Sequence, residues 1–286
     1  MSSPGPTGST VLQWMVYDGS SWSDPRPVPG VTNPGCYALA DFNAIGRLVC
    51  VYAGEGSELS WVRYSVVDQE WSKPHTDPRH VIGSHCGAAE YRQNLYVFHD
   101  GEGDFALQVT RTSDGQSWGP DEPVATHIGF GPAATAVGDR LYCVYSSPYD
   151  VQWTSFDNAS WSPGQWLGQG YDLANPPALA RFRNKPYCVF DTTESSLSWG
   201  SFENGTWSPP QQIPNGPDIA VPALARTYVG DRLVCVYYES PGKLQQLEFD
   251  GAAWKGPLAI PGVTDAGDRP ALALHGDKIY CVYRSW

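Results

Sequence analysis

The sequence predicts an all-β fold, a six-bladed β-propeller with four antiparallel strands per blade. Three short motifs support this prediction, because each occurs six times with a period near 47 residues. A repeat of this length with four short β segments has the size of one propeller blade, a sheet whose two faces pack on its neighbours. The positions of the motifs assign the four strands in turn.

The first two motifs fit the two inner strands of each blade. PALA, the clearest form of the first motif, carries small residues that suit the crowded inner wall expected around strand 1. Its six copies begin at Cys36, Cys86, Pro132, Pro177, Pro222 and Pro270. The second motif, LYCVY, is apolar on both faces, as expected for strand 2 when adjacent blades cover both. Its copies span 48–52, 95–99, 141–145, 186–190, 233–237 and 279–283.

The third motif is an aromatic or aliphatic residue, a polar turn and a tryptophan. Strand 3 precedes the turn, most clearly at 59–64, 151–156 and 197–202, and strand 4 is expected to begin at the tryptophan. Pairs such as Asn204-Gly205 favour a tight hairpin because glycine accepts a positive φ. We expect the tryptophans of this motif in the core: Trp22, Trp71, Trp118, Trp161, Trp207 and Trp254.

The two ends of the sequence complete each other. The chain starts at a third strand (11–18) and stops just after a second strand (279–286), so the terminal pieces supply one missing blade. Their pairing would close the ring and remove exposed sheet edges. We therefore expect a single domain over 1–286, with blades at approximately 32–78, 79–125, 126–168, 169–214, 215–261, and 262–286 joined with 11–31.

Composition excludes several classes of protein. The net charge of −12 argues against a nucleic-acid partner, since binding to phosphates rests on clustered Lys and Arg. No stretch approaches the roughly 18 apolar residues of a spanning helix, and the first residues lack the pattern of a secretory signal. These features predict a soluble, cytoplasmic protein without membrane insertion, with unconventional export left open.

Seven cysteines occur, and five share one place in strand 2: Cys50, Cys143, Cys188, Cys235 and Cys281. Equivalent points on a six-fold ring should lie beyond the roughly 7 Å between Cα atoms that a disulfide spans. We interpret them as small buried residues of a reducing compartment. Because no CxxC pair or Cys/His cluster at ligand spacing is present, no metal and no cofactor are expected.

The repeated turn resembles a motif of known propellers. Thr112 to Trp118 (TSDGQSW) is similar to the Asp-box of sialidase-like propellers, SxDxGxxW, a structural turn remote from the active site in that family. In its six blades and its richness in Trp and Tyr, the whole chain resembles the six-bladed propeller lectins of fungi and bacteria, of which the fucose-binding type is best known. This resemblance implies a multivalent carbohydrate-binding protein without catalytic residues, with glycans or glycoconjugates as partners.

We expect ligands at the rim formed by the 2–3 and 4–1 loops, because loops on a rigid scaffold carry binding residues. An aromatic face beside carboxylates and arginine suits neutral or N-acetylated sugars, through ring stacking and hydrogen bonds to hydroxyls. The candidate aromatic residues are Trp14, Trp61, Trp153, Trp199, Tyr52, Tyr145, Tyr237 and Tyr283. The candidate charged residues are Glu55, Asp150, Glu194, Glu239, Asp172, Asp218, Asp265, Arg63 and Arg284. Gln108 and Gln246 replace the strand-3 Trp in two blades, so fewer than six sites are expected to work.

Competing interpretations remain open at this stage. A repeated strand tryptophan also fits packing between blades, and an exposed Asp fits simple solvation. A glycoside hydrolase, including a sialidase, needs carboxylates at defined separation, and a sialidase needs three converging arginines, whereas the arginines here are spread through the repeats. A non-catalytic protein-interaction platform is the third possibility. His99, beside Asp100, Glu102 and Asp104, is where chemistry or a divalent cation would be sought, but a variant of a repeated rim position is the favoured interpretation.

Overall fold

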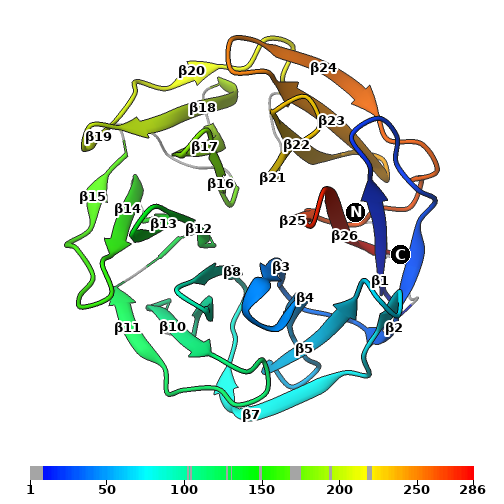
Figure 1. The fold of residues 1–286 in the computed structure, drawn as a ribbon, viewed down its shortest axis with the longest axis vertical. Helices are drawn as coiled ribbons and strands as arrows, with labels where there is room; N and C mark the ends of the chain where they lie inside the picture. Colours follow the sequence, from blue (N-terminus) through cyan, green and yellow to red (C-terminus); the bar gives the residue numbers. More distant parts are fainter. Residues whose placement is uncertain are drawn as a thin grey trace, which may run out of the picture.

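Six antiparallel sheets surround a central axis as the blades of a propeller, and the chain passes through them in sequence order (Figure 1). The computed structural model describes residues 9–101, 103, 105–126, 128–129, 131–147, 150–167, 175–192, 195–217 and 221–286. The innermost strand of each blade contacts that of the next, and β25 contacts β3, which completes the ring. The predicted fold class is confirmed.

The strands fall into four concentric layers. The innermost layer is β3 (Tyr37–Phe42), β8 (Cys86–Tyr91), β12 (Ala133–Val137), β16 (Ala178–Phe182), β21 (Pro222–Thr227) and β25 (Ala271–His275). The second layer is β4 (Arg47–Ala53), β9 (Asn94–Asp100), β13 (Arg140–Ser146), β17 (Lys185–Thr192), β22 (Arg232–Glu239) and β26 (Lys278–Ser285). These two layers correspond to the PALA and LYCVY motifs.

The third layer is β5 (Glu58–Ser65), β10 (Leu107–Thr112), β14 (Val151–Phe156), β18 (Ser195–Glu203), β23 (Lys243–Phe249) and β1 (Val11–Tyr17). The outer layer is β6 (Glu70–Trp71) with β7 (His75–Val81), β11 (Glu122–Ala125), β15 (Gln165–Trp166), β19 (Thr206–Trp207) with β20 (Gln211–Gln212), β24 (Trp254–Ala259) and β2 (Arg26–Thr32). A short 3-10 helix, η1 (Asn43–Ile45), forms the first 1–2 turn.

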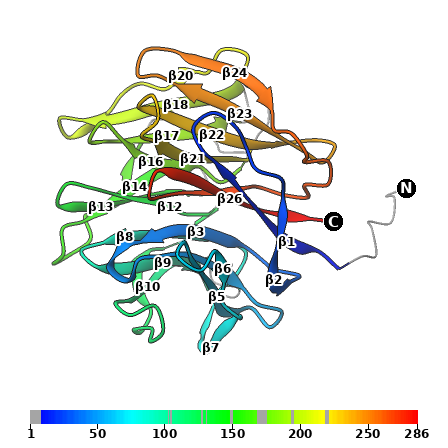
Figure 2. The ribbon, with the colours of Figure 1, turned by 45° about the vertical axis from the view of Figure 1, so that its right-hand side comes forward.

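The last blade is shared between the two ends of the chain. Strand β1 pairs along its whole length with β26, from Val11 opposite Ser285 to Tyr17 opposite Ile279. Figures 1 and 2 show these two strands side by side, with β2 on the outside and β25 nearest the axis. The ring is therefore closed by backbone hydrogen bonds between the first and last strands, as the sequence predicts.

The outer strand begins later than its tryptophan in most blades, which corrects one prediction. Trp22 and Trp161 form only a single bridge to strand 3, and continuous pairing resumes a few residues later. A serine after the tryptophan causes the interruption, because its Oγ accepts the strand-3 N–H: Ser23 from Val16 at 3.0 Å and Ser162 from Ser155 at 3.0 Å. For this reason β2 and β7 cross the expected blade boundaries at 31 and 78.

Four of the repeated turns are held by their own aspartates, Asp18, Asp114, Asp157 and Asp250. In these four, Oδ1 accepts two backbone N–H groups, two and three residues further on, with Asp114 at 2.8 Å from Gln116 and Ser117. These hydrogen bonds lower the pKa of Asp18 and of Asp114 to about 2. The same geometry recurs at Asp157 and Asp250. These turns have the structural role expected from their resemblance.

The core lies between the blades. The central residues of all six strands of the second layer are buried, and the seven cysteines are buried and free. Burial raises the pKa of the Cys50 thiol and of its equivalents in the other blades. No helix in the described part of the chain has the length and apolarity needed to span a membrane.

Candidate functional site

The strand-3 tryptophans lie in the interfaces between blades. Trp14, Trp61 and Trp153 are 6%, 4% and 6% exposed, and Trp199 is partly buried. Each ring packs against aromatic residues of the following blade. Trp153, for example, lies 4.8 Å from Phe202 and 6.5 Å from Trp207, measured between ring centroids. The structure therefore favours the packing interpretation of these rings over a fully open stacking platform.

The two blades without this tryptophan carry a glutamine at its position. Gln246 accepts a hydrogen bond from Trp22 Nε1 of the next blade at 2.5 Å and donates to Glu248 at 2.7 Å. Glu248 also accepts from Tyr17 and pairs with Arg232 at 2.6 Å. A polar network therefore replaces the aromatic contact at this interface. Gln108 occupies the corresponding position on β10.

The outer strand carries a second pattern, visible only in the pairing register. Opposite each strand-3 tryptophan stands a side chain with N–H donors: Arg26 opposite Trp14, His75 opposite Trp61, Gln165 opposite Trp153 and Gln211 opposite Trp199. Opposite the two glutamines stand apolar residues, Pro123 and Leu258. Each blade with a strand-3 tryptophan thus has a polar side chain opposite the ring, and the two blades without the tryptophan have an apolar residue there.

One cleft lies between the closing blade and the first blade. It has a volume of about 330 Å³, within the range of small-molecule sites. Its aromatic lining is Trp14, Trp22, Tyr64 and Tyr280, and its polar lining is Asp18, Ser21, Ser23, Arg26, Gln69 and Lys278. The Arg26 guanidinium carbon stands 5.4 Å from the centre of the Trp14 ring. This cleft therefore brings together aromatic rings, the guanidinium of Arg26 and the carboxylate of Asp18.

The equivalent interface of the next blade is similar in kind. The His75 imidazole stacks on Trp61 with centroids 5.5 Å apart and an interplanar angle of 18°. Arg63 Nη2 approaches His75 Nε2 at 3.5 Å, so Arg63 lies close to the side chain that stacks on Trp61. The partner of the tryptophan changes from arginine to histidine between these blades, so the two interfaces differ in chemistry.

The remaining predicted residues are dispersed. Tyr52, Tyr145, Tyr237 and Tyr283 are at most 5% exposed, so they belong to the core rather than to an open surface. Burial raises the pKa of Tyr52 and of Tyr237 to about 12. Glu55 and Asp265 are exposed, Asp150 is half-buried, and Glu239 accepts a hydrogen bond from Gln245 at 2.7 Å. Asp172, Glu194 and Asp218 lie outside the described residues.

The cleft lined by Trp14 does not bring the predicted tryptophans and rim acids together. The cleft that Trp14 lines opens toward the 3–4 turns, as Asp18, Val66 and Gln69 in its walls show, and none of the predicted rim acids lines it. Arg284 instead pairs with Asp268 at 2.6 Å and lines a separate pocket of about 440 Å³ near the 4–1 loops. Sequence reasoning missed Arg26, because its place opposite Trp14 depends on the bulge after Trp22.

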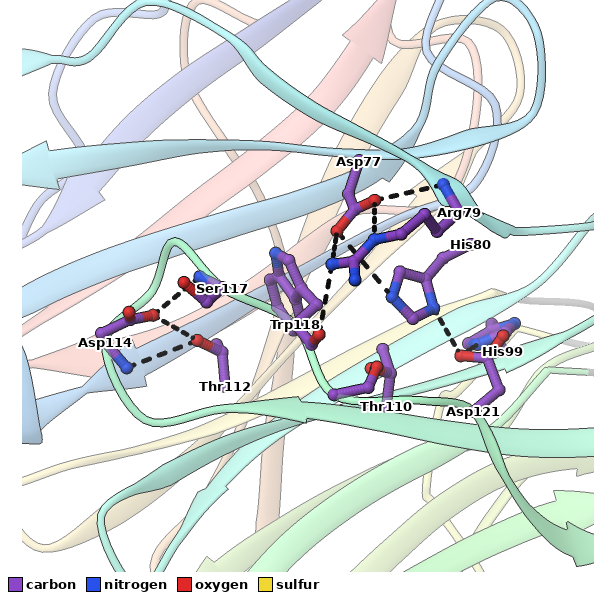
Figure 3. Close-up of polar contacts among 11 residues, drawn as sticks. Asp77, Arg79, His80, His99, Thr110, Thr112, Asp114, Ser117, Trp118 and Asp121 are labelled. Carbon is purple, nitrogen blue, oxygen red and sulfur yellow. Dashed lines mark hydrogen bonds and ion pairs between the residues drawn. The ribbon is translucent and has the colours of Figure 1, made fainter.

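His99 belongs to a polar cluster between the first two blades, drawn in Figure 3. Its Nε2 lies 3.3 Å from Asp121 Oδ1, and His80 Nδ1 lies 2.7 Å from the same oxygen. Burial raises the pKa of Asp121, but hydrogen bonds and positive charge from the two histidines outweigh it, so the net pKa is lowered. Asp77 faces His80 Nε2 at 3.9 Å and is held by Arg79.

This cluster ties the outer strand of one blade to the second strand of the next. Glu102 and Asp104, named beside His99 in the sequence, lie outside the described residues. Among the residues that the structure describes, no group of three or more His, Cys, Asp or Glu side chains could hold a metal ion. Asp121 and His80 carry no repeat signal, so the sequence did not point to them.

Comparison with known proteins places the fold among six-bladed propellers. The structure is similar to AofleA from Arthrobotrys oligospora, with a TM-score of 0.68 and 13% identity over 99% of this chain and 85% of that one. It is similar to the fucose-specific lectin from Aleuria aurantia, with a TM-score of 0.59 and 17% identity over 86% of both chains. No protein-family model matches the sequence, and no curated protein matches it.

A sialidase also shares the architecture. The Hadza microbial sialidase Hz136 has a TM-score of 0.61 and 11% identity, covering 87% of this chain and 65% of that chain. At these identities the likeness concerns the fold alone. The function of this chain therefore depends on the side chains that its surface presents to a ligand.

Proposed function

We propose that this chain is a carbohydrate-binding lectin that holds glycans in clefts between its blades. The observation that carries the proposal is the cleft formed by Trp14, Arg26 and Asp18, about 330 Å³ in volume. Sugars bind where C–H faces meet aromatic carbon and hydroxyl groups meet charged donors and acceptors. Several of the similar structures are described as fucose-specific or as complexes with fucosides, which agrees with this ligand class.

We propose further that binding is multivalent. Four blades combine a strand-3 tryptophan with a polar partner on the outer strand, and two blades combine glutamine with an apolar residue. Weak individual contacts gain strongly when several sites engage one glycan-coated surface. Neutral or N-acetylated sugars are the preferred ligands, because Arg26, His75 and the two glutamines offer hydrogen-bond donors suited to hydroxyl and acetamide oxygens.

The first test is a glycan array followed by titration calorimetry with the best ligand. Saturable binding without release of a chromogenic aglycone supports the lectin. Turnover of aryl glycosides would replace it with a hydrolase, and no binding to any glycan would favour a protein-interaction platform. Fewer than six sites per chain are expected from the titration.

Arg26→Ala tests the cleft itself. Arg26 is exposed on β2, so its truncation should weaken glycan binding at one site while the unfolding midpoint stays unchanged. Arg92→Ala is the matched control, because Arg92 is also exposed and also lies over an aromatic ring, Tyr91 at 5.5 Å, but lines no part of this cleft. Equal glycan affinity of the Arg26→Ala and Arg92→Ala variants would contradict the assignment of the Trp14 cleft as a glycan site.

A further inference from the structure

The central channel opens, at the end of the 1–2 turns, into a cavity of about 380 Å³. Its wall is made by the second halves of the innermost strands of all six blades. Most of this wall is alanine and leucine. The cavity is separate from the inter-blade clefts, since none of the residues lining the Trp14 cleft lines it.

One register position of the repeat carries charge around this mouth. The residue that follows the PALA core is, in blade order, Asp41, Glu90, Ala136, Arg181, Arg226 and Leu274, and all six line the cavity. The two acids come from adjacent blades and so do the two arginines, whose strands β16 and β21 are in contact. Six-fold order places the acidic pair across the mouth from the basic pair (Figure 1).

The acidic side is already satisfied by the protein. Asp41 Oδ1 accepts from His275 Nδ1 at 2.7 Å, and Asp41 Oδ2 accepts from Asn43 Nδ2 at 2.9 Å. Glu90 accepts the backbone N–H groups of Asn43 at 2.7 Å and Ala44 at 3.2 Å. These carboxylates hold the turn at η1, so they offer little to a ligand.

The two arginines on the basic side have fewer partners than the two acids in the part of the chain that the structure describes. Arg226 stacks on the ring of Tyr228, with its guanidinium carbon 4.4 Å from the ring centre, and donates one hydrogen bond to the phenol oxygen. Within the described residues the Arg181 side chain has no hydrogen-bond or ion-pair partner, and it lines the cavity together with Arg226. A guanidinium carries five N–H donors, so most of the donors of this pair are not used by the described part of the protein.

We infer that this channel mouth binds a small organic anion through a carboxylate held by Arg181 and Arg226. Guanidinium groups recognise planar carboxylates through two parallel charge-assisted hydrogen bonds. The alanine and leucine wall accommodates the uncharged body of such a molecule, and the satisfied acids opposite it do not compete for the arginines. Because the chain as a whole carries a net charge of −12, it repels anions in general, and the attraction for this anion comes from the two arginines.

Glucuronate and glucose provide a matched pair of probes, since they have the same ring and differ in the carboxylate. In titration calorimetry at low salt, glucuronate is expected to bind the wild-type chain saturably at a site that glucose does not occupy. Arg181→Gln and, separately, Arg226→Gln should each weaken glucuronate binding about tenfold to a hundredfold, as loss of charge-assisted hydrogen bonds predicts. Raising the salt concentration should weaken it as well.

Two controls separate this site from the proposed lectin clefts. Arg92→Gln keeps an exposed position outside the cavity and should bind glucuronate as the wild type does, and Arg26→Ala should do the same while losing glycan affinity. If Arg181→Gln and Arg226→Gln, with unchanged unfolding midpoints, both bind glucuronate as the wild type does, the inference is overturned. Equal binding of glucose and glucuronate, or binding lost only in Arg26→Ala, would overturn it too.

Discussion

Replacement of Trp153 by alanine is the most direct test of how the blades are held together. The ring is 6% exposed and packs on Tyr142 of its own blade and on Phe202 and Trp207 of the next. A buried tryptophan removes about 150 to 250 Å² from water, worth about 4 to 6 kcal/mol at about 25 cal/mol per Å². Measured losses for Trp→Ala are about 3 to 5 kcal/mol, because the cavity relaxes in part. We expect a loss of about 4 kcal/mol.

Urea unfolding followed by tryptophan fluorescence and circular dichroism measures this loss through the midpoint and slope of the transition. Gln108→Ala is the matched control, since Gln108 occupies the same strand-3 position in the preceding blade without a ring. It should cost less than about 1 kcal/mol, as truncation outside the core does. A Trp153→Ala variant that unfolds at the wild-type midpoint, with glycan binding abolished, would refute the packing argument and make the ring a ligand platform.

Three further predictions follow from charges and thiols. Asp114 has its pKa lowered to about 2 by turn hydrogen bonds, so its contribution to stability is full above pH ~4 and is lost as pH falls toward 2; Asp114→Asn should flatten the dependence of the urea midpoint between pH 4 and 2, and parallel curves would contradict this. The seven buried cysteines should be inert to a thiol reagent at neutral pH in the native protein, and all should react after unfolding in guanidinium; rapid labelling of the native chain would disprove their burial. Asp121→Asn removes the carboxylate shared by His80 and His99, so it should lower the free energy of unfolding by about 1 to 3 kcal/mol; an unchanged urea midpoint at pH 7 would mean that the cluster does not tie the blades.

The fold could be read from the sequence because its signals repeat. LYCVY is apolar on both faces and recurs in every blade, so a single misread strand would not alter the blade number. The incomplete strands at the two ends likewise predicted the shared blade that β1 and β26 form. The start of strand 4 could not be predicted in this way. In four blades a serine follows the tryptophan and its Oγ accepts a strand-3 N–H in place of a backbone carbonyl, which the apolar pattern does not reveal.

The sites were harder to predict because they depend on which side of a strand faces a neighbour. The strand-2 tyrosines and the rim acids were grouped by loop position, yet Tyr145 and Tyr237 point into the core. Arg26 was missed although it lies over Trp14, because its register is set by a bulge. Asp121 and His80 form one cluster with His99 although they are not repeated, so a search for repeats passes over them.

The coupling between strand 3 and the outer strand is a feature that the proposed binding of glycans between the blades would require. Leu258, opposite Gln246, is 63% exposed, so this outer position tolerates a large apolar side chain and solvation does not demand a polar one. In two blades the outer-strand side chain itself lies on the ring, with Arg26 over Trp14 at 5.4 Å and His75 stacked on Trp61 at 5.5 Å. Every blade with the tryptophan places an N–H donor opposite it. Under the proposed function, one ligand would contact both the ring and the donor of a blade.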